Sequence, residues 1–366
     1  MVCNTCWLVQ TEDHAGREEL FSNDYAYFSS FSESWLDHAK RYVTNIQKRF
    51  VLDETSMVCE IAANDGYLLQ YVNNADIPCY GIEPTASTAK AAREKGLEIV
   101  GEFFGKALAK KLVSEGKSAD LLAANNVLAH VPDINDFVQG FAVLLKEGGV
   151  ATFEFPHLLN LINQMQFDTI YHEHYSYLSL IAVKNIFKTN GLDIFDVDEL
   201  STHGGSLRVF AQRSDAKKHV ISSAVEKLLK QERLAGLDNL KAYEGFQTKA
   251  ESVKNNLLKF LIKAKDQGKK VAGYGAAAKG NTILNFAGIR PDLLSFIVDK
   301  NPVKAGQFMP GSHIPIVNED QLKLNKPDYI FILPWNLKTE ITNQLEYINE
   351  WGGRCVVAIP KIEIVT

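Results

Sequence analysis

The apolar and polar positions predict alternating strands and helices over most of the chain. Residues 58–72 combine a buried strand, a tight turn and then helical spacing. Shorter apolar runs at 79–83, 120–126 and 144–156 predict further strands, the last of them entered through a turn at Gly148. Because strands alternate with helices, we expect a doubly wound α/β sheet whose strand ends open on one crevice.

The pattern changes in the second half of the chain. Residues 191–213 read as two alternating strands around a turn at His203, which predicts an antiparallel hairpin that closes the first sheet. Residues 220–266 are rich in Lys, Glu, Leu and Ala, so we expect a long helical connector. A second strand, glycine turn and helix at 271–285 then opens a smaller α/β layer. Its later strands are predicted at 294–298, 329–333 and 354–359.

These patterns divide the chain into an N-terminal arm, a first α/β domain, a helical connector and a second α/β domain. The predicted bounds are 1–50, 51–215, 216–268 and 269–366. A chain of 366 residues with 46% apolar and 23% charged residues is ordinary for a globular protein of about two domains.

Charge and hydropathy exclude several partners. The net charge is −5 with both signs interspersed, so we expect no nucleic-acid partner. No apolar run approaches the roughly 18 residues of a membrane span, and Met1 does not begin a signal peptide. We therefore expect a cytoplasmic protein without membrane insertion. Cys59, Cys79 and Cys355 stand singly in apolar surroundings, which predicts reduced, buried thiols.

Cys3 and Cys6 form the only C-x-x-C pair. This spacing suits two thiolates on one tetrahedral zinc, but a closed structural site needs four ligands. His14 alone does not complete the set, so we expect a half site without fully liganded zinc.

The turn after the first strand indicates the cofactor. It lacks the G-x-G-x-x-G fingerprint of dinucleotide binding and carries Glu60, Asn64 and Asp65 instead. Carboxylates repel a pyrophosphate but suit S-adenosylmethionine, which brings a sulfonium and an ammonium group. Glu83, at the end of the second strand, is placed to accept hydrogen bonds from two ribose hydroxyls. The predicted cofactor-binding residues are Glu60, Ala62, Asn64, Asp65, Gly66, Tyr67, Glu83, Pro84 and Asn125.

Residues 153–179 concentrate the reactive groups of the chain. Tyr171, Glu173 and His174 lie between apolar, aromatic-rich ends, at a density that folding alone rarely requires. Asn126 and His130 follow another strand end and are expected to converge on this segment. His172 is more simply explained by a hydrogen bond to a backbone carbonyl.

Two further segments carry possible binding groups. Residues 273–280 form a strand-to-helix turn with three glycines and Lys279, which favours phosphate binding. Residues 21–36 interleave Tyr25, Tyr27 and other aromatics with serines. From the residues alone, a loop closing over a substrate and an arm packed on the core are equally good interpretations.

The chain resembles the sugar C-methyltransferases that act on nucleotide-linked 4-keto-deoxy sugars. The similar stretches span almost the entire chain, and Y-H-E-H is the most specific of them. They are C-x-x-C-W-L-V-Q, Y-A-Y-F-S-S-F-S-E-S-W-L-D-H-A, E-I-A-A-N-D-G-Y-L-L, N-N-V-L-A-H-V-P-D, Y-H-E-H-Y-S-Y-L-S, G-Y-G-A-A-A-K-G-N-T and D-Y-I-F-I-L-P-W-N.

The resemblance implies three parts: an N-terminal zinc-binding module, an S-adenosylmethionine domain of the class I methyltransferase type, and a smaller Rossmann-like domain that helps to hold the nucleotide-sugar. It implies that His174 is the general base, with Tyr171 and Glu173 beside it. It also favours Tyr25, Asn126 and His130 as pocket residues and Tyr25 as part of a lid. Expected substrate contacts are Tyr27, His203, Arg208, Gly275 and Lys279.

Two departures from the family pattern matter. The family's first cysteine pair has no counterpart here, which puts zinc and the N-terminal module in question. Ala62 stands where many methyltransferases have glycine, and an alanine is tolerable there if its φ is negative.

The expected reaction is base-catalysed enolate formation followed by methyl transfer to carbon. A histidine suits proton removal beside a ketone because its pKa lies near working pH. Tyr171 or His130 can donate to the enolate oxygen, and Glu173 can orient an imidazole or bind a sugar hydroxyl. Three alternatives remain at this stage: an O-methyltransferase, a nicotinamide-dependent sugar-nucleotide oxidoreductase or epimerase, and a non-catalytic nucleotide-sugar binder.

Overall fold

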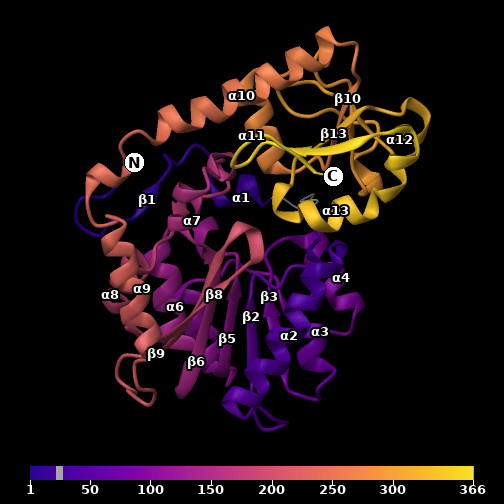
Figure 1. Cartoon of the computed structure of the whole chain (residues 1–366). Coiled ribbons are helices and arrows are strands. Elements are labelled where there is room, and N and C mark those ends of the chain that lie inside the picture. The colour runs from indigo at the N-terminus through magenta and orange to yellow at the C-terminus, as the bar shows by residue number, and fades with distance from the viewer. Residues whose placement is uncertain (22–27, 366) are drawn as a thin grey trace. The chain divides into compact units, whose positions relative to one another are not determined.

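The computed structural model describes residues 1–21 and 28–365, and the predictions for Tyr25 and Tyr27 fall outside these residues. The chain folds as two compact units (Figure 1). The first comprises Met1–Leu159 and His172–Ala242, and the second Asn160–Tyr171 and Tyr243–Thr366.

The first unit is built on a seven-stranded sheet with the order β4-β3-β2-β5-β6-β9-β8. β2 to β6 are parallel, and β9 runs antiparallel between β6 and β8. The strands are β2 Val58–Ile61, β3 Cys79–Ile82, β4 Ile99–Val100, β5 Ala119–Asn125, β6 Leu145–Pro156, β8 Leu192–Leu200 and β9 Ser206–Arg213. The predicted doubly wound sheet and its closing hairpin are confirmed.

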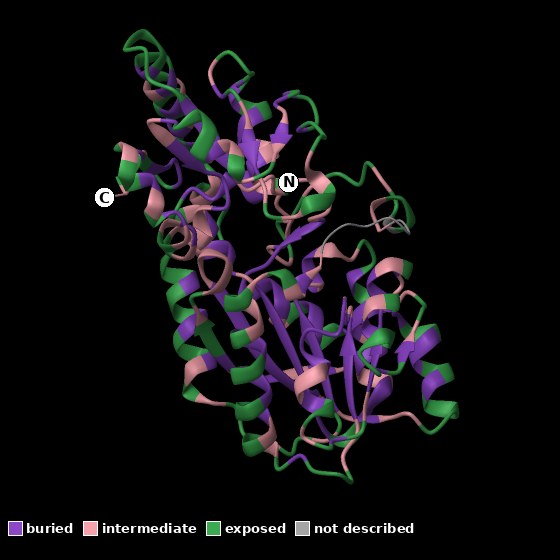
Figure 2. Ribbon diagram, turned by 90° about the vertical axis from the view of Figure 1, so that its right-hand side faces the viewer, coloured by how far each residue is buried: buried purple, intermediate pink, exposed green. Residues whose placement is uncertain are grey.

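Helices flank this sheet and have one buried side, as Figure 2 shows by the purple strands and the green outer sides of the helices. α2 buries Ala39, Tyr42, Val43 and Ile46, and Ser32 caps its start by accepting the Trp35 N–H at 3.3 Å. The helices are α2 Glu33–Phe50, α3 Leu69–Asn73, α4 Ala86–Glu94, α5 Lys106–Ser114, α6 Ile134–Leu144, α8 Leu180–Thr189 and α9 Ser223–Leu234.

The N-terminal segment joins the first unit through a small second sheet. β1 (Val9–Gln10) pairs antiparallel with β7 (Ser176–Tyr177), which follows the Y-H-E-H segment directly. The first residues of the chain therefore lie beside the segment predicted to be reactive. α1 (Arg17–Leu20) continues this N-terminal part, and α7 (Leu158–Asn163) follows β6.

The second unit contains a six-stranded sheet with the order β12-β11-β10-β13-β14-β15. The expected smaller α/β layer is confirmed, with β15 as an added antiparallel edge. Its strands are β10 Val271–Tyr274, β11 Ile297–Val298, β12 Ile316–Val317, β13 Tyr329–Ile332, β14 Arg354–Val357 and β15 Glu363–Val365. Its helices are α10 Phe246–Asp266, α11 Ala278–Ala287, α12 Asp320–Asn325 and α13 Lys338–Gln344.

Two elements differ from the prediction. Gly148 does not precede a strand but lies inside β6, where three extra residues bulge between the pairs formed by Leu145 and Val150. The helical stretch expected at 220–266 is divided into α9 and α10. Gly236 and Gly245, in the segment between these helices, both adopt positive φ. Gly236 lies just after the end of α9, and Gly245 stands directly before the start of α10.

Candidate functional site

The turn after β2 has an unusual backbone. Ala62, Asn64 and Gly66 all adopt positive φ, at 59°, 50° and 75°. Gly66 is required in addition because a Cβ there would lie 2.3 Å from the Leu97 side chain. Ala62 does not meet the condition of a negative φ: the turn holds its backbone in the left-handed region, which costs an L-residue roughly 1–2 kcal/mol.

Glu83 supports this turn from the end of β3. One of its carboxylate oxygens accepts the Asn64 N–H and the other accepts the Thr85 N–H, both at 2.9 Å. Glu83 is 5% exposed, so these two bonds fix the carboxylate at the mouth of the turn. Each oxygen retains a lone pair that can accept from a ribose hydroxyl.

Carboxylates crowd the same turn. Burial raises the pKa of Glu60 well above its usual range, and the charges of Asp65 and Glu83 act in the same direction. Tyr67, which is 3% exposed, opposes this rise by hydrogen bonding. A cationic ligand relieves this repulsion and a phosphate increases it. The residues present therefore fit S-adenosylmethionine.

The segment at residues 28–31 lies against this turn. The backbone N–H of Ser29 donates to Asn64 Oδ1 at 2.9 Å, and that of Ser30 donates to Asp65 Oδ2 at 3.3 Å. Lys95 joins the two segments, because its Nζ donates to the Asp65 carbonyl at 2.6 Å and to Ser30 Oγ at 2.9 Å. Sequence reasoning missed Lys95, since a lysine at the end of an amphipathic helix carries no distinguishing signal.

Two amide side chains follow β5. Asn125 is 7% exposed, and Asn126 adopts a φ of 53° while its N–H donates to the Glu154 carbonyl at 2.7 Å. Neither side-chain amide has a hydrogen-bond partner among the described residues. Buried amides without partners are costly, so these two are suited to a bound molecule.

His130 and His174 meet beside these amides in the fold of the first unit. Their rings lie edge to face with centroids 4.6 Å apart, and the ring of Tyr177 is 6.2 Å from that of His174. Burial lowers the pKa of His130 to about 4, and a backbone contact at Glu173 acts in the opposite direction. His130 is therefore a neutral imidazole at physiological pH.

The backbone around His174 is fixed on both sides. Its carbonyl accepts from Thr11 Oγ1 at 2.9 Å, and the N–H of Tyr175 donates to the Ala129 carbonyl at 2.8 Å. The second bond joins the Y-H-E-H segment to the turn that carries His130. The N-terminal segment thus holds His174 in place, a role that sequence reasoning did not assign to it.

The rest of the Y-H-E-H segment divides between the units. Tyr171 is the last residue of the part that folds with the second unit, whereas His172 and Glu173 belong to the first. His172 is exposed, and its ring contacts that of His14 with centroids 5.2 Å apart. This contact differs from the backbone hydrogen bond expected for His172.

Arg208 and His203 lie in a polar cluster at the β6–β9 pair. Arg208 forms a buried ion pair with Glu154, which also contacts His38 Nε2 at 2.9 Å. Burial alone would raise the pKa of Glu154, but His38 and Arg208 together lower it to about 2. The ring of His203 contacts that of Trp35 at 4.9 Å. Arg208 is thus engaged inside the protein, and only His203 and Trp35 are partly exposed.

The glycine turn of the second unit has its own fixed geometry. Gly275 has a φ of 88°, and a Cβ there would lie 2.5 Å from Pro334. Asp299, at the end of β11, accepts the Ala276 N–H at 2.7 Å and contacts Lys304 Nζ at 3.3 Å. Asp299 thus supports this turn as Glu83 supports the turn after β2.

Lys279 lies at the start of α11. Its Nζ donates to Asn336 Oδ1 at 2.7 Å and stands 4.8 Å from the centroid of the Trp335 ring. Ala277, at the N-cap position, has no side chain to cap the helix. The first backbone N–H groups of α11 can therefore serve an anion.

Cys3 and Cys6 share a tight turn near the N-terminus. Hydrogen bonds from the backbone N–H groups of Cys6 and Thr5 lower the pKa of Cys3 to about 7. Trp7 follows with a φ of 64°. Among residues 1–21 and 28–365, no group of three or more His, Cys, Asp or Glu side chains is arranged to hold a metal ion. No helix in this part of the chain is long and apolar enough to cross a membrane.

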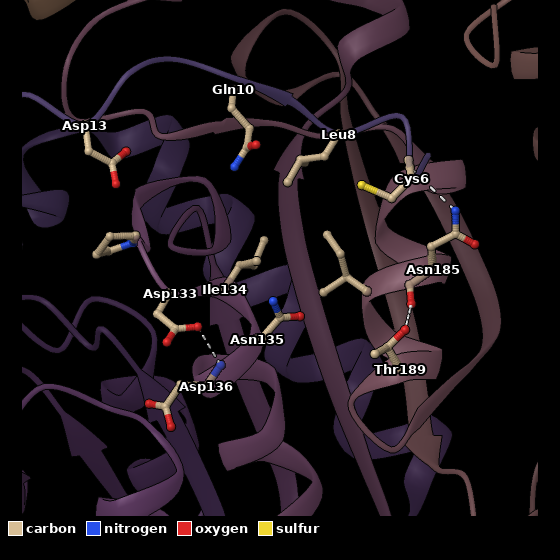
Figure 3. Close-up of a pocket in the computed structure, with 12 residues that line it drawn as sticks. Cys6, Leu8, Gln10, Asp13, Asp133, Ile134, Asn135, Asp136, Asn185 and Thr189 are labelled. Atoms are coloured by element: carbon tan, nitrogen blue, oxygen red, sulfur yellow. Dashed lines mark hydrogen bonds between the residues drawn. The ribbon is translucent and has the colours of Figure 1, made fainter. Parts of the chain in front are cut away.

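A pocket of about 830 Å³ opens between the N-terminal segment and helices α6 and α8 (Figure 3). Cys6, Leu8 and Gln10 line one side, and Ile134 and Asn185 line the other. Of the predicted catalytic residues that the structure describes, none lines it. One of its carboxylates has a structural role, since Asp133 accepts the Asp136 N–H at 3.0 Å and so caps α6.

Three features define a class I methyltransferase fold that uses S-adenosylmethionine: the strand order of the first unit, its antiparallel β9, and the carboxylate-rich turn after β2. We call this turn, residues 62–66, the donor turn, because S-adenosylmethionine is the methyl donor. Residues 35–197 match the family described as a methyltransferase domain, and residues 201–360 match the C-methyltransferase C-terminal domain. The C-methyltransferase NovU of Streptomyces niveus is 32% identical over 366 residues, covering 100% of this chain and 87% of the relative. The chain belongs to this C-methyltransferase family.

Solved structures give weaker likenesses. The magnesium protoporphyrin IX methyltransferase ChlM from Synechocystis, with bound S-adenosylmethionine, is 16% identical over 54% of this chain and 89% of that one, with a TM-score of 0.37. An S-adenosylmethionine-dependent methyltransferase from Clostridium acetobutylicum is 11% identical over 54% and 95%, with a TM-score of 0.39. The family membership rests on the sequence matches.

Proposed function

We propose that this S-adenosylmethionine-dependent C-methyltransferase acts in the cytoplasm on a nucleotide-linked 4-keto-deoxy sugar and methylates a carbon next to the ketone. The observation that carries the proposal is the edge-to-face contact of His130 and His174, 4.6 Å between ring centroids. One neutral imidazole beside a second histidine offers a donor and a base within one small region. Removing a proton beside a ketone requires both.

His174 is the proposed general base. Its backbone is held by a bond from Thr11 to its carbonyl and by the neighbouring Tyr175–Ala129 bond. The proton leaves the carbon for an imidazole nitrogen of His174, and negative charge develops on the ketone oxygen. The neutral ring of His130 or the Tyr171 hydroxyl donates to that oxygen, and Glu173 binds a sugar hydroxyl or orients an imidazole.

Asn125 and Asn126 complete the proposed pocket. Their buried amides provide donors and acceptors that no described protein group uses. We assign Asn125, the last residue of β5, to S-adenosylmethionine and Asn126, which follows it, to the sugar substrate. When bound beside these residues, S-adenosylmethionine would supply an electrophilic methyl group to the carbanion carbon and would leave as S-adenosylhomocysteine.

The second unit is proposed to bind the nucleotide part of the acceptor. The uncapped start of α11 and the turn at Gly275 support this assignment, because phosphate oxygens are favoured at such N-termini. Lys279 adds a positive charge at the same helix start. His203, with Trp35 against it, is proposed to contact the sugar from the first unit.

The test combines transfer with proton exchange. The purified protein is incubated in D₂O with S-adenosylhomocysteine and a nucleotide-linked 4-keto-deoxy sugar, and exchange beside the ketone is followed by NMR. We expect exchange with the ketone and none with the corresponding 4-hydroxy sugar. With S-adenosylmethionine, NMR of the product should then place the new methyl on carbon. Methylation of the 4-hydroxy sugar on oxygen, without exchange in the ketone, would establish the O-methyltransferase instead.

The dinucleotide alternative has a separate test. Because the turn after β2 lacks the dinucleotide fingerprint and carries carboxylates that repel a pyrophosphate, we expect no binding of NAD⁺ or NADP⁺ in isothermal titration. S-adenosylmethionine should bind with a dissociation constant in the micromolar range. Tight dinucleotide binding would favour the oxidoreductase or epimerase alternative over the methyltransferase. The start of α11 would then be a dinucleotide site and not a site for the sugar nucleotide. Binding of the sugar nucleotide without exchange or transfer would favour a non-catalytic binder.

A further inference from the structure

The chain immediately before the Y-H-E-H segment is embedded in the second unit. The chain passes from the first unit to the second within α7, at Asn160, and returns to the first unit at His172. Met165 and Phe167 are buried in the apolar core of the second unit, together with Ile283 and Leu284 of α11. The ring of Phe167 also contacts that of Phe286, with centroids 5.3 Å apart. The segment that leads into the proposed catalytic loop thus belongs to the core around α11.

Asp168 makes the polar connection of this segment. It is fully buried, and its Oδ2 accepts the indole N–H of Trp335 at 2.8 Å. Its Oδ1 has no hydrogen-bond partner within the described residues. Burial raises the pKa of Asp168 to about 6, while the charge of Lys279 and the Trp335 bond act against the rise. A buried carboxylate held by one directed bond is a costly arrangement unless it has a purpose beyond packing.

The same contacts reach the start of α11. Lys279 Nζ stands over the face of the Trp335 ring and donates to Asn336 Oδ1. Lys279 is the second residue of α11, directly after the glycine turn. A single set of contacts therefore connects Asp168, through Trp335, to the helix start where we place the nucleotide phosphates.

Covalent connectivity makes this relationship significant for catalysis. Only two residues separate Asp168 from Tyr171, and five separate it from His174. A trans peptide fixes successive Cα atoms 3.8 Å apart, so a displacement at Asp168 is passed on within a few residues. Catalysis is sensitive to such shifts, since a misplacement of about 1 Å can cost on the order of 100-fold in rate.

We infer that Asp168 and Trp335 are positioning residues, which hold the catalytic loop through the chain and couple it to the occupant of the α11 start. This inference rests on the proposed function, because it takes His174 as the base. Neither Asp168 nor Trp335 is proposed to contact a reacting atom. Their effect is on how often Tyr171 and His174 adopt the productive geometry.

The test compares two tryptophans of the second unit. Trp335→Phe removes the indole N–H that bonds Asp168 but keeps an aromatic ring beneath Lys279. Trp351→Phe is the matched control, because the Trp351 indole N–H also makes one hydrogen bond, to the Pro327 carbonyl at 3.1 Å. We expect Trp335→Phe to lower kcat and the rate of proton exchange beside the ketone about tenfold, with donor affinity and KM within about twofold. Trp351→Phe should leave both rates within about twofold.

A second variant keeps the inference testable if Trp335→Phe folds poorly. Asp168→Asn preserves the shape of the side chain and removes the charge that faces Lys279. Asp168→Asn and Trp335→Phe should each lower the rate of proton exchange. Because both variants remove the same Asp168–Trp335 contact, the fold-reduction in the double variant should be smaller than the product of the two single reductions. Circular dichroism and thermal unfolding check that each variant remains folded.

The outcomes separate the inference from the proposed function. Absence of exchange in the wild-type protein would refute His174 as a base beside a ketone. Exchange in the wild type with equal rates in Trp335→Phe and Trp351→Phe would overturn the positioning role alone. A rise in KM without a change in kcat or exchange would also overturn it, since Trp335 would then act as a substrate contact.

Discussion

The imidazole rings of His130 and His174 meet edge to face, 4.6 Å between centroids and 72° between planes. His130 follows β5 and His174 precedes β7, so the contact joins two strand-end segments that are distant in the sequence. The backbone bond from Tyr175 to Ala129 holds these segments together. The pair is therefore built into the fold and does not depend on the side chains alone.

The first prediction concerns the base. His174→Gln keeps a polar side chain but cannot accept a proton, so we expect kcat to fall by about 10²–10⁴-fold with donor affinity unchanged. His172→Gln is the control, because His172 is exposed and its ring contacts His14. Steady-state methyl transfer and calorimetric donor titration measure the two effects. Near-normal turnover in His174→Gln would remove His174 as base.

The second prediction concerns pH. The pKa of His130 is lowered from 6.5 to about 4 by burial, so the unfolded chain takes up its proton first as the pH falls. Neutral His130 therefore contributes fully to the free energy of unfolding above about pH 6.5, and this contribution is lost as the pH falls toward about 4. NMR of protein labelled at histidine should show the His130 ring unchanged from pH 8 to 5.5, with His130→Gln for assignment. A midpoint near 6.5 would contradict its neutral, donating role.

Much of this fold was predictable because the pattern of buried strands carries the information. Glu83, Asn125 and Asn126 are at strand ends, as expected, since parallel strands of one sheet end on one edge. The class of cofactor also followed from the carboxylates around Asn64, and family membership confirms it. The catalytic and binding roles of individual residues remain predictions.

The features that sequence reasoning missed depend on tertiary placement. Lys95 has no distinguishing neighbour in the sequence, and its partners at Ser30 and Asp65 are 65 and 30 residues away. Asp168 lies in a stretch of mixed apolar and polar residues without a motif, and only the folding of residues 160–171 with the second unit reveals its contact with Trp335. The positive φ of Ala62 was missed because alanine rarely adopts it, whereas the turn at Glu83 requires it.

The third prediction concerns this strained alanine. Ala62→Gly removes the Cβ penalty at a φ of 59° but adds entropy to the unfolded chain, so we expect a net gain of about 0.5–1 kcal/mol. Such a gain corresponds to an upward shift of roughly 1–4 °C in Tm. Ala63→Gly is the matched control: Ala63 is fully buried and has no positive φ, so it should be destabilised by about 1 kcal/mol. Equal shifts in both variants would show that the Ala62 backbone is not strained.

The final prediction concerns Lys95. Its Nζ bonds both Ser30 and the Asp65 carbonyl, so the segment at residues 28–31 and the donor turn stabilise each other. Lys95→Gln shortens and neutralises this connection, and a lost charge-assisted bond of about 1–1.5 kcal/mol would weaken donor binding roughly five- to tenfold.

Lys90→Gln provides the control on the same helix. Lys90 is exposed and contacts only Glu94, at 3.9 Å, among the described residues, so its loss should leave donor affinity within about twofold. Hydrogen exchange of residues 28–36, with and without S-adenosylmethionine, gives an independent readout. Because coupling between two sites is reciprocal, the donor should protect this segment in the wild type and protect it less in Lys95→Gln. Unchanged protection on donor binding, together with equal affinities in the two variants, would show that this contact does not couple the segment to the donor.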